Sequence, residues 1–219
     1  MTTDHTIKEN ITAELNWEPM VVADHIGVAV RDGLVTLSGH VESYWQKRAA
    51  EKAAGRVKGV KAIVEEIEVR LPPHILRTDE EIAAAAVNRL EWDGAVPMDA
   101  VKVMVQGGNV TLSGTVAQHY QRRAAAWAVE PLWGVRSVAN QIAVMDGATP
   151  LVDPGEMAAD IRHALHRAWF ESDTVTVMAK DGAITLGGHV ENLQARKLAM
   201  DTAWAAPGTR SVENHIRIG

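Results

Sequence analysis

Three pairs of basic residues recur at matching places along the chain and are the side chains best suited to bind a ligand. The pairs are Lys47 and Arg48, Arg122 and Arg123, and Arg196 and Lys197. Cations of this kind attract phosphate and carboxylate groups, and each contributes about 1 kcal/mol near an anionic membrane. The pairs therefore predict three cationic spots for a phospholipid surface or an acidic protein partner. The alternative is a set of solvated helix faces with intrahelical ion pairs.

The other reactive side chains form no catalytic or metal-binding pattern. His163 and His166 lie three residues apart on a predicted helix, but the sequence offers no obvious third ligand, so we expect no metal site. The absence of cysteine excludes disulfides and thiolate chemistry. No Ser-His-Asp arrangement, carboxylate pair or nucleotide-binding loop is visible. We expect no catalytic residue and no cofactor, and a protein that is not an enzyme.

Tryptophans are the remaining candidates for contact with a partner, because the indole ring suits a membrane interface or a protein surface. They stand at the ends of predicted first helices, on predicted second helices, and once before a final strand: Trp17, Trp92 and Trp169; Trp45, Trp127 and Trp204; Trp133. We expect most of them to pack in the core or between units. Trp45 and Trp127 are predicted to cap the core. Trp204 is predicted to be exposed or to contact another unit.

These residues belong to a unit that occurs three times. Residues 32–41 read DGLVTLSGHV, 107–116 read GGNVTLSGTV and 181–190 read DGAITLGGHV, which gives spacings of 75 and 74 residues. Nine glycines follow the same spacings and are expected to hold backbone turns rather than a phosphate group. They are Gly33, Gly39, Gly59, Gly108, Gly114, Gly134, Gly182, Gly188 and Gly208.

Each unit is predicted to contain two helices. Ile7, Ile11 and Leu15 lie four residues apart, which places them on one face of a first helix, and both later units repeat this spacing. Thr6, Thr78 and Asp153 are the expected N-terminal caps of these first helices. The second helices are predicted over residues 43–57, 118–130 and 192–206.

Each unit is also predicted to contain three strands. The first strands, over 26–30, 101–105 and 175–179, lead through Asp-Gly or Gly-Gly into the repeated motif, which is a hairpin signal. The last strands are expected over 60–69, 135–144 and 209–218. The fold class is therefore α+β, with three tandem αββαβ units, each a three-stranded mixed sheet with two helices packed on one face. The predicted domains are 1–70, 79–145 and 156–219, with linkers 71–78 and 146–155.

The pattern DG-x-VTLSG-x-V, then a helix with a basic pair, then GV-x-x-V-x-N-x-I, resembles the BON domain. Residues 32–41 with 59–67, 107–116 with 134–142, and 181–190 with 208–216 carry it. BON domains occur in bacterial osmotic-stress proteins, secretins and some mechanosensitive channels. The resemblance implies the αββαβ fold and a role in binding phospholipid or envelope surfaces. The first unit departs from the pattern, because Glu65 stands where the others have Asn140 and Asn214.

The charge balance and the hydropathy pattern narrow the function further. The chain has 22 Lys and Arg against 28 Asp and Glu, a formal charge of −6, so we expect no nucleic-acid partner. No signal peptide or spanning apolar run is visible, so we expect a cytoplasmic protein, or a periplasmic one if a signal was removed. The predicted function is a non-enzymatic, stress-associated binding module with multivalent attachment to an anionic surface such as phospholipid, or to a protein partner. A self-associating structural protein is the alternative, followed by a sensor with an ion or small ligand between repeats.

Overall fold

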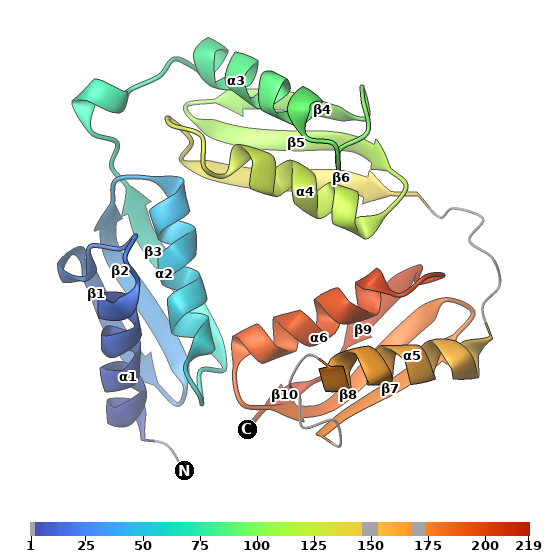
Figure 1. Cartoon of the computed structure of the whole chain (residues 1–219). Coiled ribbons are helices and arrows are strands. Elements are labelled where there is room, and N and C mark those ends of the chain that lie inside the picture. Colours follow the sequence, from blue (N-terminus) through green and yellow to red (C-terminus); the bar gives the residue numbers. More distant parts are fainter. Residues whose placement is uncertain (1–2, 146–152, 168–173) are drawn as a thin grey trace.

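The computed structural model describes residues 3–145, 153–167 and 174–219 of the chain. Three αββαβ units, called repeats 1, 2 and 3, follow one another along the chain and lie around a common centre (Figure 1). Repeat 1 comprises α1 (Asp4–Trp17), β1 (Ile26–Arg31), β2 (Leu34–Val41), α2 (Tyr44–Arg56) and β3 (Ala62–Val69), with the short helix η1 (Ala23–His25). Repeat 2 comprises α3 (Asp79–Trp92), β4 (Val101–Gln106), β5 (Asn109–Val116), α4 (His119–Val129) and β6 (Ser137–Val144), and the short helix η2 (Pro73–Ile75) precedes it. Repeat 3 comprises α5 (Pro154–Arg167), β7 (Val175–Lys180), β8 (Ala183–Val190), α6 (Leu193–Ala205), β9 (Ser211–Asn214) and β10 (Arg217–Ile218).

The three sheets share one mixed topology, as predicted. In repeat 1 the order is β1-β2-β3, with β2 antiparallel to β1 and parallel to β3, and repeat 2 has the same arrangement. In repeat 3 the last strand is divided into β9 and β10, both parallel to β8, where a single strand over 209–218 was expected. His215 between them still donates its backbone N–H to the Leu186 carbonyl oxygen at 2.8 Å, so the chain stays beside β8.

The hairpin turns have the backbone conformation that their sequences predict. Asp32 and Gly33 have φ of 53° and 78°, and the corresponding residues of the other hairpins also have positive φ. The carboxylate of Asp4, the first residue of α1, accepts hydrogen bonds from the N–H groups of Asp32 and Gly33 at 2.8 and 3.1 Å. Asp79 does the same for the hairpin of repeat 2. A first-helix aspartate therefore holds the turn in two repeats, and the 75-residue spacing of Asp4 and Asp79 was the signal for it.

The first helices begin close to the predicted caps. Thr78 and Glu81 form the expected capping box at the start of α3, and Asp153 accepts backbone hydrogen bonds at the start of α5. The prediction of Thr6 as the cap of α1 was wrong. Thr3 is the N-cap, because its hydroxyl accepts a hydrogen bond from the Thr6 N–H at 3.3 Å. The additional turn brings Asp4 to the start of the helix, where it reaches the hairpin.

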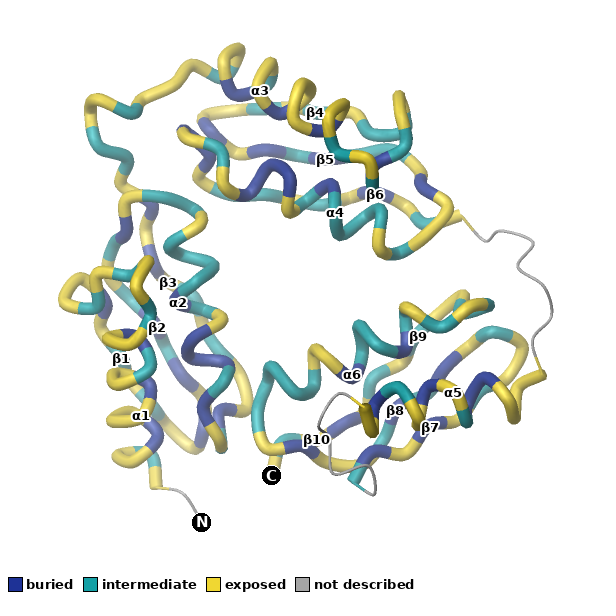
Figure 2. The backbone as a smooth tube through the Cα atoms, in the orientation of Figure 1, coloured by how far each residue is buried: buried dark blue, intermediate teal, exposed yellow. Residues whose placement is uncertain are grey.

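Each repeat has its own hydrophobic core between its helices and one face of its sheet (Figure 2). In β2, Val35 and Leu37 are fully buried, while Thr36 and Ser38 on the other face are partly exposed. All nine repeated glycines have positive φ; they are Gly33, Gly39, Gly59, Gly108, Gly114, Gly134, Gly182, Gly188 and Gly208.

Candidate functional site

The second helices α2, α4 and α6 face one another across the centre of the molecule (Figure 1). At each junction between repeats, the first residue of one second helix lies at the C-terminal end of the next repeat's second helix. The three pairs are Tyr44 with Glu130, His119 with Trp204, and Leu193 with Gly55. The three first residues of the helices are spaced by 75 and 74 positions along the chain, and so are the three residues at the helix ends. The same two positions of the repeat therefore meet at all three junctions. We call this arrangement the second-helix ring. It is a head-to-tail contact that closes after three members.

The contacts at these positions differ in chemistry. The rings of His119 and Trp204 are stacked, with centroids 4.6 Å apart and planes 5° apart. Leu193 packs against the buried cluster of repeat 1, and Tyr44 packs against the clusters of both repeat 1 and repeat 2. Burial lowers the pKa of His119, as expected for an imidazole inside a junction. Trp204 therefore makes the contact between units that the sequence predicted.

Polar contacts join repeat 3 to repeat 1 in addition. Lys58 forms an ion pair with Glu191, whose carbonyl oxygen accepts a hydrogen bond from the Gly59 N–H at 3.0 Å. The Gln194 side-chain amide donates to the Lys52 carbonyl oxygen at 3.3 Å. The N-terminal end of α6 is therefore held on the C-terminal end of α2.

Glu130 lies where all three repeats approach one another. It is 8% exposed and is the one buried charged residue in the part of the chain that the structure describes. Arg48 of repeat 1 places its Nε 3.6 Å from a Glu130 carboxylate oxygen. Burial raises the pKa of Glu130, while the charges of Arg48 and of Lys197 in repeat 3 act in the opposite direction. One carboxylate in repeat 2 thus interacts with cations from both other repeats.

The raised pKa of Glu130 predicts how the second-helix ring responds to pH. Since this pKa lies above the usual 4.5, the folded protein holds a proton at pH values where the unfolded chain has released it. The resulting stability is complete below the unfolded pKa and is lost as the pH rises through the folded pKa. We expect wild type to gain stability relative to Glu130→Gln as the pH falls from 7 toward 5. Urea titrations at a series of pH values measure the difference, and a pH-independent difference contradicts this assignment.

The first member of each basic pair binds the last strand of its own repeat. The side chains of Lys47, Arg122 and Arg196 donate to backbone carbonyl oxygens at 2.7, 3.2 and 3.2 Å respectively. The acceptors are Ile67, Asn140 and Asn214. These three cations therefore connect the second helix to the sheet.

The second member of each pair lies at the ring. Arg48 approaches Glu130, Arg123 forms an ion pair with Asp201 of repeat 3 at 2.7 Å, and the charge of the exposed Lys197 acts on Glu130. The three pairs thus lie around the centre of the molecule. Binding of an anionic surface by these pairs stays a prediction.

Glu65 departs from the repeated pattern, and the residue that it contacts on the second helix differs from that of the other repeats as well. Glu65 forms an ion pair with Lys47 at 2.7 Å. In repeat 2, Asn140 stands at this position and donates from its side chain to the Arg122 carbonyl oxygen at 2.6 Å. Lysine therefore accompanies glutamate, and arginine accompanies asparagine, so the departure retains a link between helix and strand.

The tryptophans are more exposed than predicted. Trp127 is 55% exposed beneath the Arg123 guanidinium, which lies 4.5 Å from its ring centroid, and Trp45 donates its indole N–H to the Met20 sulfur. Neither belongs to a core cluster, so the prediction that they cap the core was wrong. Trp17 and Trp92, at the ends of α1 and α3, are 82% and 83% exposed. Trp169 lies outside the described residues.

Neither a metal site nor a membrane-spanning helix is found within the described ranges. No group of three His, Asp or Glu side chains in those ranges is arranged to hold a metal ion, and this includes the surroundings of His163 and His166. None of the described helices is both long enough and apolar enough to cross a bilayer.

These features define a chain of three tandem αββαβ domains joined through their second helices. The BON domain model matches residues 3–70, 78–146 and 154–219, so the chain belongs to the BON domain family. It is 33% identical over 147 residues to osmotically-inducible protein Y of Escherichia coli K12, a match that covers 64% of this chain and 71% of that protein.

Two solved structures show only distant similarity. CdsD, a structural protein of the type III secretion system of Chlamydia trachomatis, gives a TM-score of 0.27 at 15% identity, covering 96% of this chain and 91% of that one. The PrgH periplasmic domain gives a TM-score of 0.22 at 11% identity, covering 89% and 95%. No function follows from scores this low.

Proposed function

We propose that this protein is a non-enzymatic binding protein of a bacterial osmotic-stress response and that it attaches to a phospholipid surface through Trp17 and Trp92. The family and the similarity to an osmotically inducible protein support the stress association. The exposure of two indoles at equivalent positions carries the proposal of attachment. An indole that is left in water at the end of a helix is suited to the interface between lipid and water.

The closure of the second-helix ring supports a flat binding partner. A ring that closes relates its members by rotation, so equivalent positions lie at the same level along its axis. We therefore expect Trp17 and Trp92 to be presented to the same side of the molecule. Two anchors on one side can contact a membrane together, and the second then binds at a raised effective concentration.

The charges favour attachment driven by the indoles rather than by cations. Five of the six basic-pair residues are engaged in helix-to-strand bonds or in ion pairs at the ring, and the whole chain carries a charge of −6. An anionic headgroup thus finds no surplus of positive charge around Trp17 or Trp92, whose neighbours include Glu18 and Asp93. We expect binding to zwitterionic vesicles that added anionic lipid does not strengthen.

Vesicle flotation tests the proposal. Wild type is expected to float with phosphatidylcholine vesicles, and Trp17→Ala with Trp92→Ala is expected to weaken binding by at least about tenfold. Complete burial of one indole removes about 150–250 Å² from water. If binding buries a third of that area, the burial contributes about 1.5 kcal/mol, which corresponds to a roughly tenfold change in the dissociation constant.

Trp133→Ala is the matched control, because Trp133 is 54% exposed but lies outside the first helices. It is expected to float like wild type. Absence of wild-type binding to both neutral and anionic vesicles would contradict the lipid proposal and leave a protein partner. Binding to anionic vesicles alone, lost in salt, would instead favour the basic pairs.

A further inference from the structure

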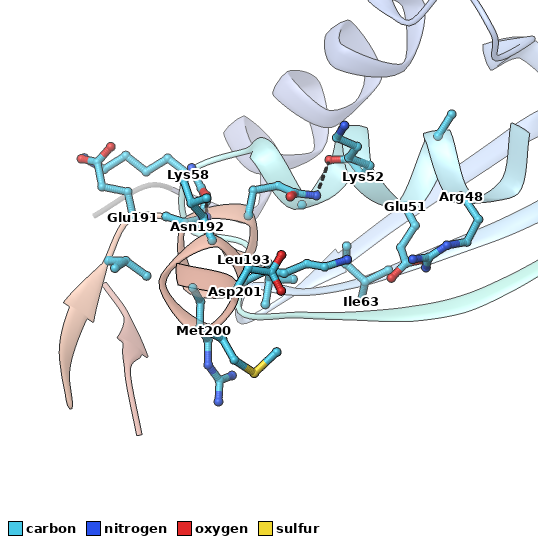
Figure 3. Close-up of a pocket in the computed structure, with 18 of the residues that line it drawn as sticks. Arg48, Glu51, Lys52, Lys58, Ile63, Glu191, Asn192, Leu193, Met200 and Asp201 are labelled. Atoms are coloured by element: carbon cyan, nitrogen blue, oxygen red, sulfur yellow. Dashed lines mark hydrogen bonds and ion pairs between the residues drawn. The ribbon is translucent and has the colours of Figure 1, made fainter. Parts of the chain in front are cut away.

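The second-helix ring contains a cavity of about 1630 Å³ that the proposed membrane contact does not use (Figure 3). Its walls come mainly from α2 and α6, with Trp127 and Glu130 contributed by repeat 2. Small-ligand sites are usually about 300–1,000 Å³, so this cavity has room for an organic molecule together with water. One of the sequence-based alternatives was a small ligand bound between repeats, and this cavity is such a space.

The carboxylates that line the cavity already have cationic partners. Each one forms an ion pair with a lysine or arginine: Glu18, Glu51, Glu130, Glu191 and Asp201. By contrast, the ammonium groups of Lys52 and Lys197 make no ion pair or hydrogen bond with any described residue. Both lysines line the cavity, so the two charged side chains of its lining that have no ion pair or hydrogen bond to a described residue are cations.

These lysines lie near a third cation, Arg48, which pairs with Glu51 and Glu130. Lys52 follows Arg48 by one helical turn on α2, so both point to the same side of that helix. Lys197 acts on Glu130, which is the carboxylate that Arg48 approaches. The Nε of Arg48 is buried and has no hydrogen-bond partner among the described residues. This atom has almost no accessible surface, so an anionic group in the cavity would act on Arg48 through the charge of its guanidinium rather than by a hydrogen bond to Nε.

Part of the remaining lining of the cavity is apolar and exposed, beside polar residues such as His189, Asn192 and Arg196. Met20, Trp45, Trp127 and Leu198 line it, and each is at least 36% exposed. Large apolar side chains from three repeats around one hollow form a surface that an apolar chain can cover. The cationic and apolar parts together match a molecule with an anionic head and an apolar tail.

We propose that this cavity binds a single-chain amphipathic anion, with a carboxylate or phosphate head among Lys52, Lys197 and Arg48 and an apolar tail against Trp127 and Leu198. The site is separate from Trp17 and Trp92. It therefore predicts a ligand for the protein in solution, whether or not the protein attaches to a membrane.

Isothermal titration calorimetry with the full chain tests this site, with each probe below its critical micelle concentration. Decanoate and monodecyl phosphate are expected to bind with one-to-one stoichiometry, and decyltrimethylammonium is expected to bind at least tenfold more weakly. Acetate is expected not to bind, because it lacks the tail. Lys52→Gln with Lys197→Gln is expected to weaken decanoate binding at least tenfold.

Lys102→Gln with Lys180→Gln is the matched control, because these lysines are exposed on β4 and β7 and do not line the cavity. It is expected to bind decanoate like wild type, and so is Trp17→Ala with Trp92→Ala. Equal affinity for decanoate and decyltrimethylammonium would overturn the proposal. So would unchanged affinity in the Lys52 and Lys197 variant, or no binding of either anion to wild type.

Discussion

Gly114→Ala is expected to lower the free energy of unfolding by more than about 3 kcal/mol. Gly114 lies in β5 with φ of 131°, a conformation that residues with a side chain rarely adopt. A Cβ at this position would lie 2.0 Å from the Ala100 carbonyl oxygen, which is backbone and cannot rotate away. Because Gly114 pairs with Val101, the substitution should separate the start of β4 from β5.

Urea denaturation followed by circular dichroism measures this loss, and amide hydrogen exchange locates it in β4 and β5. Gly94→Ala is the matched control in the same repeat, since a Cβ there meets no atom within 4 Å and its φ is not positive. It should change stability by no more than about 0.5 kcal/mol. A loss below about 1 kcal/mol for Gly114→Ala would show that the backbone relaxes at this position.

Arg48→Met is expected to cost about 2 kcal/mol, because it leaves the buried carboxylate of Glu130 without its nearest cation. Breaking a buried ion pair by removing one partner costs about 3–5 kcal/mol, and the partial exposure of the Arg48 side chain reduces this value. Lys197 also remains near Glu130. The loss of stability should therefore be confined to the junction between repeats 1 and 2, while the cores of the repeats stay intact.

A double-mutant cycle separates this junction from other effects of losing Arg48. Arg48→Met combined with Glu130→Gln should cost less than the sum of the two single variants, because the neutral amide no longer requires a cation. Arg48 also pairs with Glu51, but Glu51 is more exposed, so Glu51→Gln should cost less than about 0.5 kcal/mol. Strict additivity of the Arg48 and Glu130 variants would contradict the coupling.

The fold within each repeat was predictable because its determinants are local. Asp-Gly and Gly-Gly between alternating strands require positive φ at both turn residues, and the hairpins at Asp32 and Gly107 have it. The spacing of Ile7, Ile11 and Leu15 gave the buried face of α1. The break between β9 and β10 was missed, since the sequence around His215 follows the pattern of the unbroken strand β6.

The second-helix ring could not be predicted, because position rather than residue type is repeated in it. Tyr44, His119 and Leu193 are an aromatic, an imidazole and an aliphatic side chain, and no shared chemistry marks them as equivalent contacts. Their partners are equally unlike one another. The basic pairs were visible, but a pair that ties its helix to a strand cannot be told by sequence from one that faces a ligand.

The cavity depends on the same second-helix ring, and the sequence suggested it only through the alternative of a small ligand between repeats. Lys197 belongs to a repeated basic pair but Lys52 follows no pattern, and nothing in the sequence links the two, because the carboxylates around them already have other cationic partners. That balance involves residues from all three repeats. Charge counting along the chain cannot reproduce it, since the pairing crosses from one repeat to another.

Head-to-tail closure leaves no docking position vacant among the three modules. The leading end of the third module already occupies the trailing end of the first, as Leu193 does beside Gly55. A fourth module gained by duplication would find no vacant docking position, and loss of one module would leave one docking position of each kind uncovered. A shortened version would leave both docking positions in contact with water, where a neighbouring molecule could cover them.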